Sequence, residues 1–169
     1  MSTKRLFFAL WPDNRQRDRM RDFISPVAKL VEGRAIDRRN WHITLAYIGE
    51  FQEQLIPSLL TAASEIEVEP FRLRFDKLEY WPRPKIAALV TPNVPSELQA
   101  LVQQVNHVLL AANIVVEERT YRPHVTVVRN ARPFETQRLA QSAEIQWSDF
   151  RLIESVREPG GATYRPVDQ

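Results

Sequence analysis

The sequence contains no cysteine and only three histidines, His42, His107 and His124. The absence of cysteine excludes disulfide bonds, thiolate-bound zinc and a thiol nucleophile. No apolar run approaches the roughly 20 residues that a membrane-spanning helix needs, and the apolar stretch from Leu6 to Trp11 is too short for a signal peptide. We therefore expect a cytoplasmic protein without a membrane segment.

Lysine is also scarce, with four residues against 19 arginines, and the formal net charge is only +2. Guanidinium groups match phosphate oxygens through paired hydrogen bonds, which an ammonium group cannot do. The excess of arginine is equally consistent with a GC-rich coding bias. A length of 169 residues with 44% hydrophobic residues predicts one domain, residues 1–169, made of two lobes and acting as a monomer.

Apolar spacing predicts an α+β fold with mostly antiparallel strands. The first helix opens at an N-cap, Asp13, carries its apolar stripe through Leu30 to Val31, and contains Pro26, which we expect to kink it. The segments Pro82-Arg83-Pro84 and Pro159-Gly160-Gly161 predict hairpin turns. Further predicted helices cover about 52–67, 95–109 and 134–143, and predicted strands cover about 4–10, 34–37, 41–48 (closed by Gly49), 71–81, 86–90, 125–128, 149–156 and 163–167.

Two of the three histidines lie in matching contexts, HITLA from residue 42 and HVTVV from residue 124. Residues two apart on a strand share a face, so His42 and Thr44 point one way while their apolar neighbours point into the core. His124 and Thr126 repeat this arrangement in the second half of the chain. We therefore predict two pseudo-equivalent lobes, each presenting one motif strand to a shared cleft. His107 falls off the apolar stripe of its helix, and we expect it to be exposed.

Paired imidazoles across a cleft suit proton transfer, because a neutral imidazole accepts a proton and a protonated one donates it. The hydroxyl groups of Thr44 and Thr126 can donate to the non-bridging oxygens of a phosphodiester, and Arg129 adds a guanidinium. The sequence has no Walker loop, no carboxylate cluster and no third histidine at metal-ligand spacing. These residues predict metal-free chemistry on a phosphodiester, without a cofactor.

The motifs resemble the paired His-x-Thr/Ser-x signatures of the two-histidine (2H) phosphoesterases. The stretches RLFFALWP, WHITLAYIGE and RPHVTVVR, and the C-terminal SVREPGGATYRPV, are similar to segments of the RNA 2',3'-cyclic phosphodiesterases, also called 2'-5' RNA ligases. This resemblance implies a bilobal fold, with two antiparallel sheets flanked by helices and the histidines facing each other across a central cleft. It also implies hydrolysis of RNA ends bearing a 2',3'-cyclic phosphate to a 2'-phosphate, or the reverse 2'-5' ligation.

Carried over by position, the resemblance implies that His42 and His124 are catalytic and that Thr44, Thr126 and Arg129 bind the substrate. Arg129 lies five residues after His124, so on a regular strand it would face away from the cleft. We expect it to reach the cleft only if the strand ends or bulges near Val128.

The nucleobase requires a further contact, and stacking on an aromatic face is the usual one. Phe7 and Tyr121 are the preferred candidates, because strand parity places Tyr47, five residues beyond His42, on the opposite face. Three alternatives stay open. The cleft could bind RNA ends without catalysis, or it could hydrolyse 2'-5' oligoadenylates or ADP-ribose-type cyclic phosphates. The paired motifs could also be coincidental in a structural domain.

Overall fold

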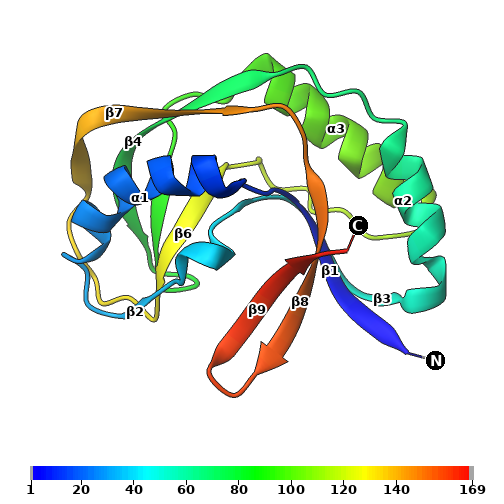
Figure 1. Cartoon of the computed structure of the whole chain (residues 1–169), viewed down its shortest axis with the longest axis horizontal. Helices are drawn as coiled ribbons and strands as arrows, with labels where there is room; N and C mark the ends of the chain where they lie inside the picture. The colour runs from blue at the N-terminus through cyan, green and yellow to red at the C-terminus, as the bar shows by residue number, and fades with distance from the viewer. Residues whose placement is uncertain (1, 168–169) are drawn as a thin grey trace.

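The computed structural model describes residues 2–167, which form two antiparallel sheets flanked by helices (Figure 1). The first sheet has the strand order β3-β1-β8-β9, and the second has the order β2-β6-β5-β4-β7. The predicted α+β class with two antiparallel sheets is confirmed. The strands are β1 (Thr3–Leu10), β2 (Arg34–Ala35), β3 (Ile43–Gln52), β4 (Phe71–Trp81), β5 (Ile86–Val90), β6 (His124–Arg129), β7 (Gln137–Trp147), β8 (Arg151–Glu158) and β9 (Gly161–Pro166).

The helices are α1 (Asn14–Ala28), α2 (Ile56–Ser64) and α3 (Ser96–Ala111), with short 3-10 helices η1 (Arg38–Asn40) and η2 (Glu53–Leu55). Helix α1 comes from the first half of the chain but packs against β6 and β7 of the second sheet, whereas α3 packs against β3 of the first (Figure 1). The two halves of the chain therefore interleave and do not form one lobe each. Within the described residues, no helix has the length and apolar character needed to cross a membrane.

Helix α1 begins at a capping box, as its N-cap predicted. The Asp13 side chain accepts a hydrogen bond from the Gln16 backbone N–H, and the Gln16 side chain accepts one from the Asp13 N–H. Pro26 lies in the last turn, and the helix ends at Ala28. Leu30 therefore lies beyond the helix and is exposed, so its assignment to the buried stripe was wrong.

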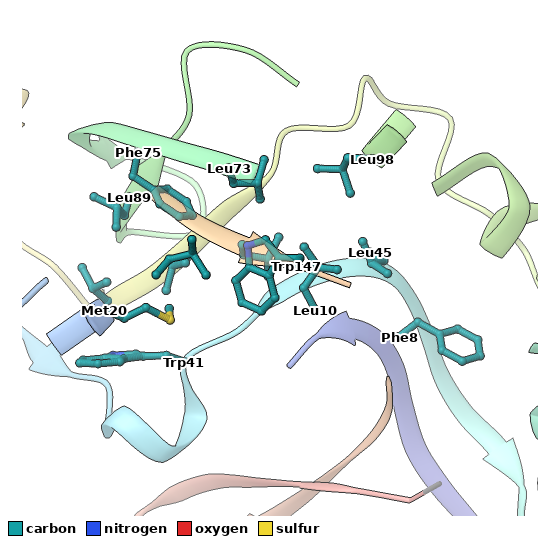
Figure 2. Close-up of a cluster of buried hydrophobic side chains, with 14 of the residues drawn as sticks. Phe8, Leu10, Met20, Trp41, Leu45, Leu73, Phe75, Leu89, Leu98 and Trp147 are labelled. Atoms are coloured by element: carbon teal, nitrogen blue, oxygen red, sulfur yellow. The ribbon is translucent and has the colours of Figure 1, made fainter. Parts of the chain in front are cut away.

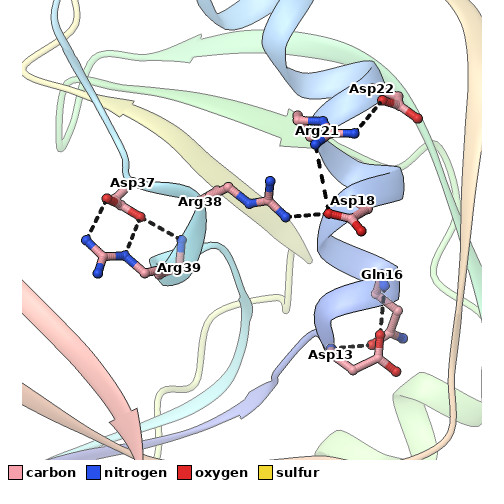
Figure 3. Close-up of polar contacts among 8 residues, drawn as sticks. All are labelled: Asp13, Gln16, Asp18, Arg21, Asp22, Asp37, Arg38 and Arg39. Carbon is pink, nitrogen blue, oxygen red and sulfur yellow. Dashed lines mark hydrogen bonds and ion pairs between the residues drawn. The ribbon is translucent and has the colours of Figure 1, made fainter.

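Short polar contacts attach η1 to α1 (Figure 3). The Arg38 guanidinium donates to the Asp18 carboxylate at 2.6 Å, and Asp37 accepts from both the backbone and the side chain of Arg39. Because η1 ends two residues before His42, these contacts fix the entry of the first motif strand into the cleft.

Two predictions about local structure were wrong. Residues 134–143 were expected to be partly helical, but β7 occupies 137–147 and pairs with β4. The helix-forming composition of this segment is overridden by sheet pairing, which buries Ala143, Ile145 and Trp147 in alternation. Strand β3 also continues past Gly49, because that glycine adopts a φ of 84° at a bulge in the strand and does not end it.

The main core lies between the two sheets and the helices (Figure 2). It contains Phe8 and Leu10 of β1, Met20 of α1, Phe75 of β4 and Trp147 of β7, all almost fully buried. Two smaller apolar clusters lie on the opposite faces of the sheets. One consists of Phe7, Ala9 and Ile153 with Trp11 and Tyr164, and the other of Ile86, Ala88 and Val90 with Trp81.

Candidate active site

All five motif residues line a single cavity of about 1070 Å³. Its walls come from β3, β6, the β4–β5 hairpin, α3 and the segment 116–122. Ile43 and Leu45, which alternate with the first motif pair, are buried, and so are Val125 and Val127 beside the second pair. The alternation predicted for both motif strands is therefore present. The five residues that line the cavity are His42, Thr44, His124, Thr126 and Arg129.

Both histidines are held in the same way. Nδ1 of His42 lies 2.8 Å from the carbonyl oxygen of Asn40, and Nδ1 of His124 lies 2.8 Å from that of Arg122. A carbonyl oxygen only accepts, so each Nδ1 carries the proton and each neutral imidazole presents an unprotonated Nε2. The Nε2 of His42 lies 3.0 Å from the Thr44 hydroxyl oxygen. This tautomer suits an imidazole that exchanges its proton through Nε2.

A bulge follows the threonine in each motif. Val127 of β6 has no partner on β5, because Thr126 pairs with Ala88 and Val128 with the adjacent Ala87. The extra residue reverses the alternation of the strand and turns Arg129 into the cavity. Arg129 therefore reaches the cleft through a bulge next to Val128, one of the two ways that the sequence allowed.

The first motif strand contains the same irregularity. Leu45 has no partner on β1, because Thr44 pairs with Ala9 and Ala46 with Phe8. The parity is again reversed, and Tyr47 lines the cavity with 48% of its surface exposed. The placement of Tyr47 on the far face was therefore wrong. Tyr47 and Arg129 occupy equivalent positions, each five residues after a motif histidine.

Each histidine also rests on aromatic rings. The His42 ring lies 4.9 Å from Phe7, 5.2 Å from Tyr164 and 6.1 Å from Trp11, measured between ring centroids. The His124 ring lies 4.4 Å from Trp81, whose ring also lies against the guanidinium of Arg122. Neither imidazole is free to rotate away from its carbonyl partner without disrupting this packing.

The two residues proposed to bind the base are placed differently from each other. Phe7 is only 4% exposed and packs against the rings of His42 and Tyr164. Tyr121 lines the cavity, but its hydroxyl donates to the Thr44 carbonyl oxygen at 2.9 Å and its burial raises the pKa of the phenol. The third histidine, His107, is exposed as predicted and lies outside the cavity.

Burial changes the acidity of both motif histidines. Loss of solvent lowers the pKa of His42 to about 4, and the nearby His124 and Arg129 act in the same direction. Burial also lowers the pKa of His124, helped by Arg122 and Arg129. In each case the carbonyl partner raises the pKa but does not outweigh burial. Both imidazoles are therefore neutral at pH 7 before an anion binds.

Reasoning from the sequence missed three residues that contact the motif histidines or Arg129. The Arg129 guanidinium donates to the Tyr164 hydroxyl at 3.4 Å, and the Tyr164 ring touches His42. The side chain of Asn40 binds β9, accepting from the Tyr164 N–H and donating to the Ala162 carbonyl. Trp81 supports His124. Tyr164 and Trp81 lie far in sequence from the residues they contact, so only the proximity of Asn40 to His42 gave a signal.

Among residues 2–167, no group of three or more histidine, aspartate or glutamate side chains is arranged to hold a metal ion.

Comparisons with known proteins agree on one family. Residues 13–154 match the sequence model of the 2'-5' RNA ligase superfamily. The RNA 2',3'-cyclic phosphodiesterase of Archaeoglobus fulgidus is 26% identical over 96% of this chain and 97% of that protein. The protein of the same name from Escherichia coli is 25% identical over 97% of this chain and 94% of its own.

A solved structure shows the same fold. The structure of E. coli LigT complexed with 3'-AMP superimposes with a TM-score of 0.86 at 25% identity, covering 98% of this chain and 96% of that one. The duplicated His-x-Thr strands, the cavity between them and the match over residues 13–154 lead to one conclusion: this chain belongs to the 2'-5' RNA ligase superfamily.

Proposed function

We propose that this protein is a phosphoric diester hydrolase that opens RNA 2',3'-cyclic phosphate ends to 2'-phosphates. The observation that carries the proposal is the matched pair of imidazoles, both holding a proton on Nδ1 and both lining one cavity beside a threonine. The relatives named RNA 2',3'-cyclic phosphodiesterase, which match nearly the full chain, support the same substrate class.

In the proposed reaction, water attacks phosphorus and the bond between phosphorus and the 3' oxygen breaks. One imidazole Nε2 accepts a proton from the water, and the other, protonated, gives a proton to the departing 3' oxygen. We assign the base to His42, because its lowered pKa of about 4 keeps it unprotonated at neutral pH. His124 is then the acid, and the negative charge of the bound phosphate favours its protonated form.

The phosphoryl oxygens are held by donors from both sheets. Thr44 and Thr126 lie in equivalent positions, and Arg129 is turned toward them by the bulge at Val127. These donors match the charge that develops on the non-bridging oxygens as water adds. No step of this scheme requires a metal ion or a nucleotide cofactor.

Tyr47 is the residue we propose to stack on the nucleobase, in place of Phe7 and Tyr121. Its ring lines the cavity and is half exposed, while its hydroxyl accepts from Nε of Arg5 at 2.7 Å. Phe7 is covered by its neighbours and the Tyr121 hydroxyl is engaged with β3. A half-exposed ring that is fixed at its hydroxyl end is suited to stacking.

Ligation through a 2'-5' linkage is a second candidate function, favoured by the family match to 2'-5' RNA ligases. Ligation would place the 5'-hydroxyl of another RNA where water stands in hydrolysis. One imidazole would take the proton of that hydroxyl and the other would give a proton to the departing 3' oxygen, which leaves a 2'-5' phosphodiester.

The deciding experiment supplies purified protein with nucleoside 2',3'-cyclic phosphates and with oligonucleotides ending in that group, in the presence of EDTA. Phosphorus NMR then identifies the product, which we expect to be the 2'-phosphate. Absence of turnover with every cyclic phosphate, or a requirement for one added divalent ion, would refute the proposal. Turnover confined to 2'-5' oligoadenylates would reassign the substrate of the same site.

A further inference from the structure

The cavity has an aromatic end and a cationic end, and the ribose ring of a nucleotide carries the base on one side and the 5' carbon on the other. In a nucleoside 2',3'-cyclic phosphate the base is attached next to C2', and the 5' carbon is attached through C4' next to C3'. When the cyclic phosphate faces the histidines, the base and the 5' side of the nucleotide therefore point to opposite ends of the site. This inference rests on the proposed function.

Tyr47 marks the aromatic end. It lies five residues beyond His42 along β3, which corresponds to roughly 16 Å of strand. Arg129 marks the other end, because its partner Tyr164 also touches His42. With the base on Tyr47, the upstream RNA would leave the site past Arg129.

The second sheet places a row of residues at that end. Arg34 of β2 pairs with Arg129 of β6, which pairs with Ile86 of β5, which pairs with Trp81 of β4. Residues that pair across neighbouring strands point to the same face, so Arg34 shares the face on which Arg129 lines the cavity. The β4–β5 turn beside this row adds Arg83, which also lines the cavity, and Lys85, which is exposed. We call Arg34, Arg83, Lys85 and Arg129 the arginine end.

These four cations differ from the other basic residues around the cavity. Arg119 and Arg122 form ion pairs with Glu117 and Glu79, whereas within residues 2–167 no carboxylate lies within 4.0 Å of the side-chain nitrogens of the arginine end. Like charges on directly paired residues, such as Arg34 and Arg129, destabilise a sheet. An anion bound there would remove that repulsion.

We infer that Arg83, which lines the cavity, and Lys85 beside it bind the phosphodiester upstream of the terminal nucleotide, while Arg129, nearer the histidines, holds the terminal phosphate. The ligand is single-stranded RNA of at least two nucleotides, recognised by its backbone charge. The protein therefore prefers oligonucleotide ends to mononucleotides.

The test measures binding of the reaction product, so it does not depend on turnover. Fluorescence anisotropy follows a short oligoribonucleotide ending in a 2'-phosphate, and competition with a nucleoside 2'-phosphate gives the affinity for the terminal nucleotide alone. The double variant Arg83→Gln/Lys85→Gln removes two charges and keeps a polar, unbranched side chain at both positions. The matched control, Arg15→Gln/Arg19→Gln, removes two exposed charges of α1 that lie outside the cavity.

We expect the wild type and the control to bind the oligonucleotide several-fold more tightly than the nucleotide. The Arg83/Lys85 variant should lose that preference, and its slope of log affinity against log salt, measured between about 50 and 200 mM, should fall by about 0.7, the value for one neutralised phosphate of a single strand. An Arg83/Lys85 variant that matches the control in both slope and preference would overturn the inference. Failure of the proposed function would instead appear as absent cyclic-phosphate turnover by the wild type.

Discussion

At the scale of single residues, the site is determined by what holds the two imidazoles. The Nδ1–H of each imidazole donates to the backbone carbonyl oxygen of the residue two positions earlier, and an aromatic ring packs against each imidazole. The surroundings are nevertheless unequal, since His42 contacts three aromatic rings and His124 contacts one. This difference in burial is the physical basis for assigning different roles to two residues in matching motifs.

The roles can be separated with a substrate whose 3' bridging oxygen is replaced by sulfur. A thiolate leaves without protonation, so His124→Ala, which lacks the proposed acid, should recover turnover of this analogue. His42→Ala should stay inactive on both substrates, because each still needs the base. On the oxygen substrate, each change should lower kcat by about 10²- to 10⁴-fold, and Thr44→Ala or Thr126→Ala by about 10²-fold. Equal recovery of both histidine variants would remove the assignment, and His107→Ala should match the wild type.

The lowered pKa of His42 also predicts how stability depends on pH. In the unfolded chain the pKa of this imidazole has its ordinary value of 6.5, whereas in the folded protein the pKa is about 4. Burial of the neutral His42 imidazole therefore contributes its full share of the folding free energy above pH 6.5. This share, about 3 kcal/mol, is lost as the pH falls toward 4. Urea unfolding across this range should show a smaller decrease for His42→Asn, whose amide can still donate to the Asn40 carbonyl. An identical slope in wild type and variant would contradict the burial argument.

Tyr164 connects Arg129 to His42, and its two contacts can be removed separately. Tyr164→Phe deletes only the hydroxyl that accepts from Arg129, so we expect KM to rise by about 2- to 10-fold, the value of one hydrogen bond, with kcat largely kept. Tyr164→Leu also removes the ring edge against His42 and should lower kcat as well. Steady-state kinetics distinguish these outcomes. If both variants change KM and kcat in the same proportion, Tyr164 acts only through general stability.

At the scale of elements, the bulges decide which side chains enter the cleft. The motif strands, the long strand 71–81, the strand 86–90 and both hairpin turns could be predicted from the sequence, because alternation and turn chemistry are local. The position of Tyr47 could not, because the bulge at Leu45 exists only in the pairing with β1. The same limit applies to β7, whose strand state depends on β4. The shared face of histidine and threonine in each motif was predictable, because both residues precede the bulge.

The β8–β9 hairpin reaches the site through Asn40, and this link can be tested. The Asn40 side chain makes two hydrogen bonds with β9, so Asn40→Ala should lower the free energy of unfolding by about 1 to 3 kcal/mol. The backbone carbonyl of Asn40 accepts from His42 Nδ1. The variant keeps this carbonyl but no longer anchors it to β9, so kcat should fall together with stability. The control Asn93→Ala removes an exposed asparagine and should change neither. Unchanged kcat in a destabilised Asn40→Ala variant would show that the hairpin does not position His42.

At the scale of the whole molecule, the two sheets are joined by elements that cross between the halves of the chain. Helix α1 of the first half packs on the second sheet, and β8 of the second half pairs with β1 of the first. The lobes share one main core, which includes residues of both sheets. We therefore expect the two lobes to fold as a single cooperative unit.

This expectation concerns equilibrium unfolding. Thermal transitions followed by far-UV circular dichroism and by tryptophan fluorescence should coincide, because Trp11 and Trp41 report on the first half of the chain and Trp81 and Trp147 on later strands. Fragments 1–92 and 93–169 should not fold when expressed separately. Two resolved transitions, or one fragment with a cooperative melt, would show that the lobes are independent domains.

The pairing of β1 with β8 has a consequence for the order in which the enzyme is made. Phe7 leaves the ribosome before its neighbour in the sheet, Ile153, which is added only after every other strand except β9. Until then β1 has an unpaired edge, which is open to proteases and to other chains. For the same interval, Phe7 lacks the packing against Ile153 that supports it beside His42. A chain released early by interrupted translation would therefore carry both His-x-Thr motifs and still be unable to act on RNA, and its exposed strand would mark it for removal.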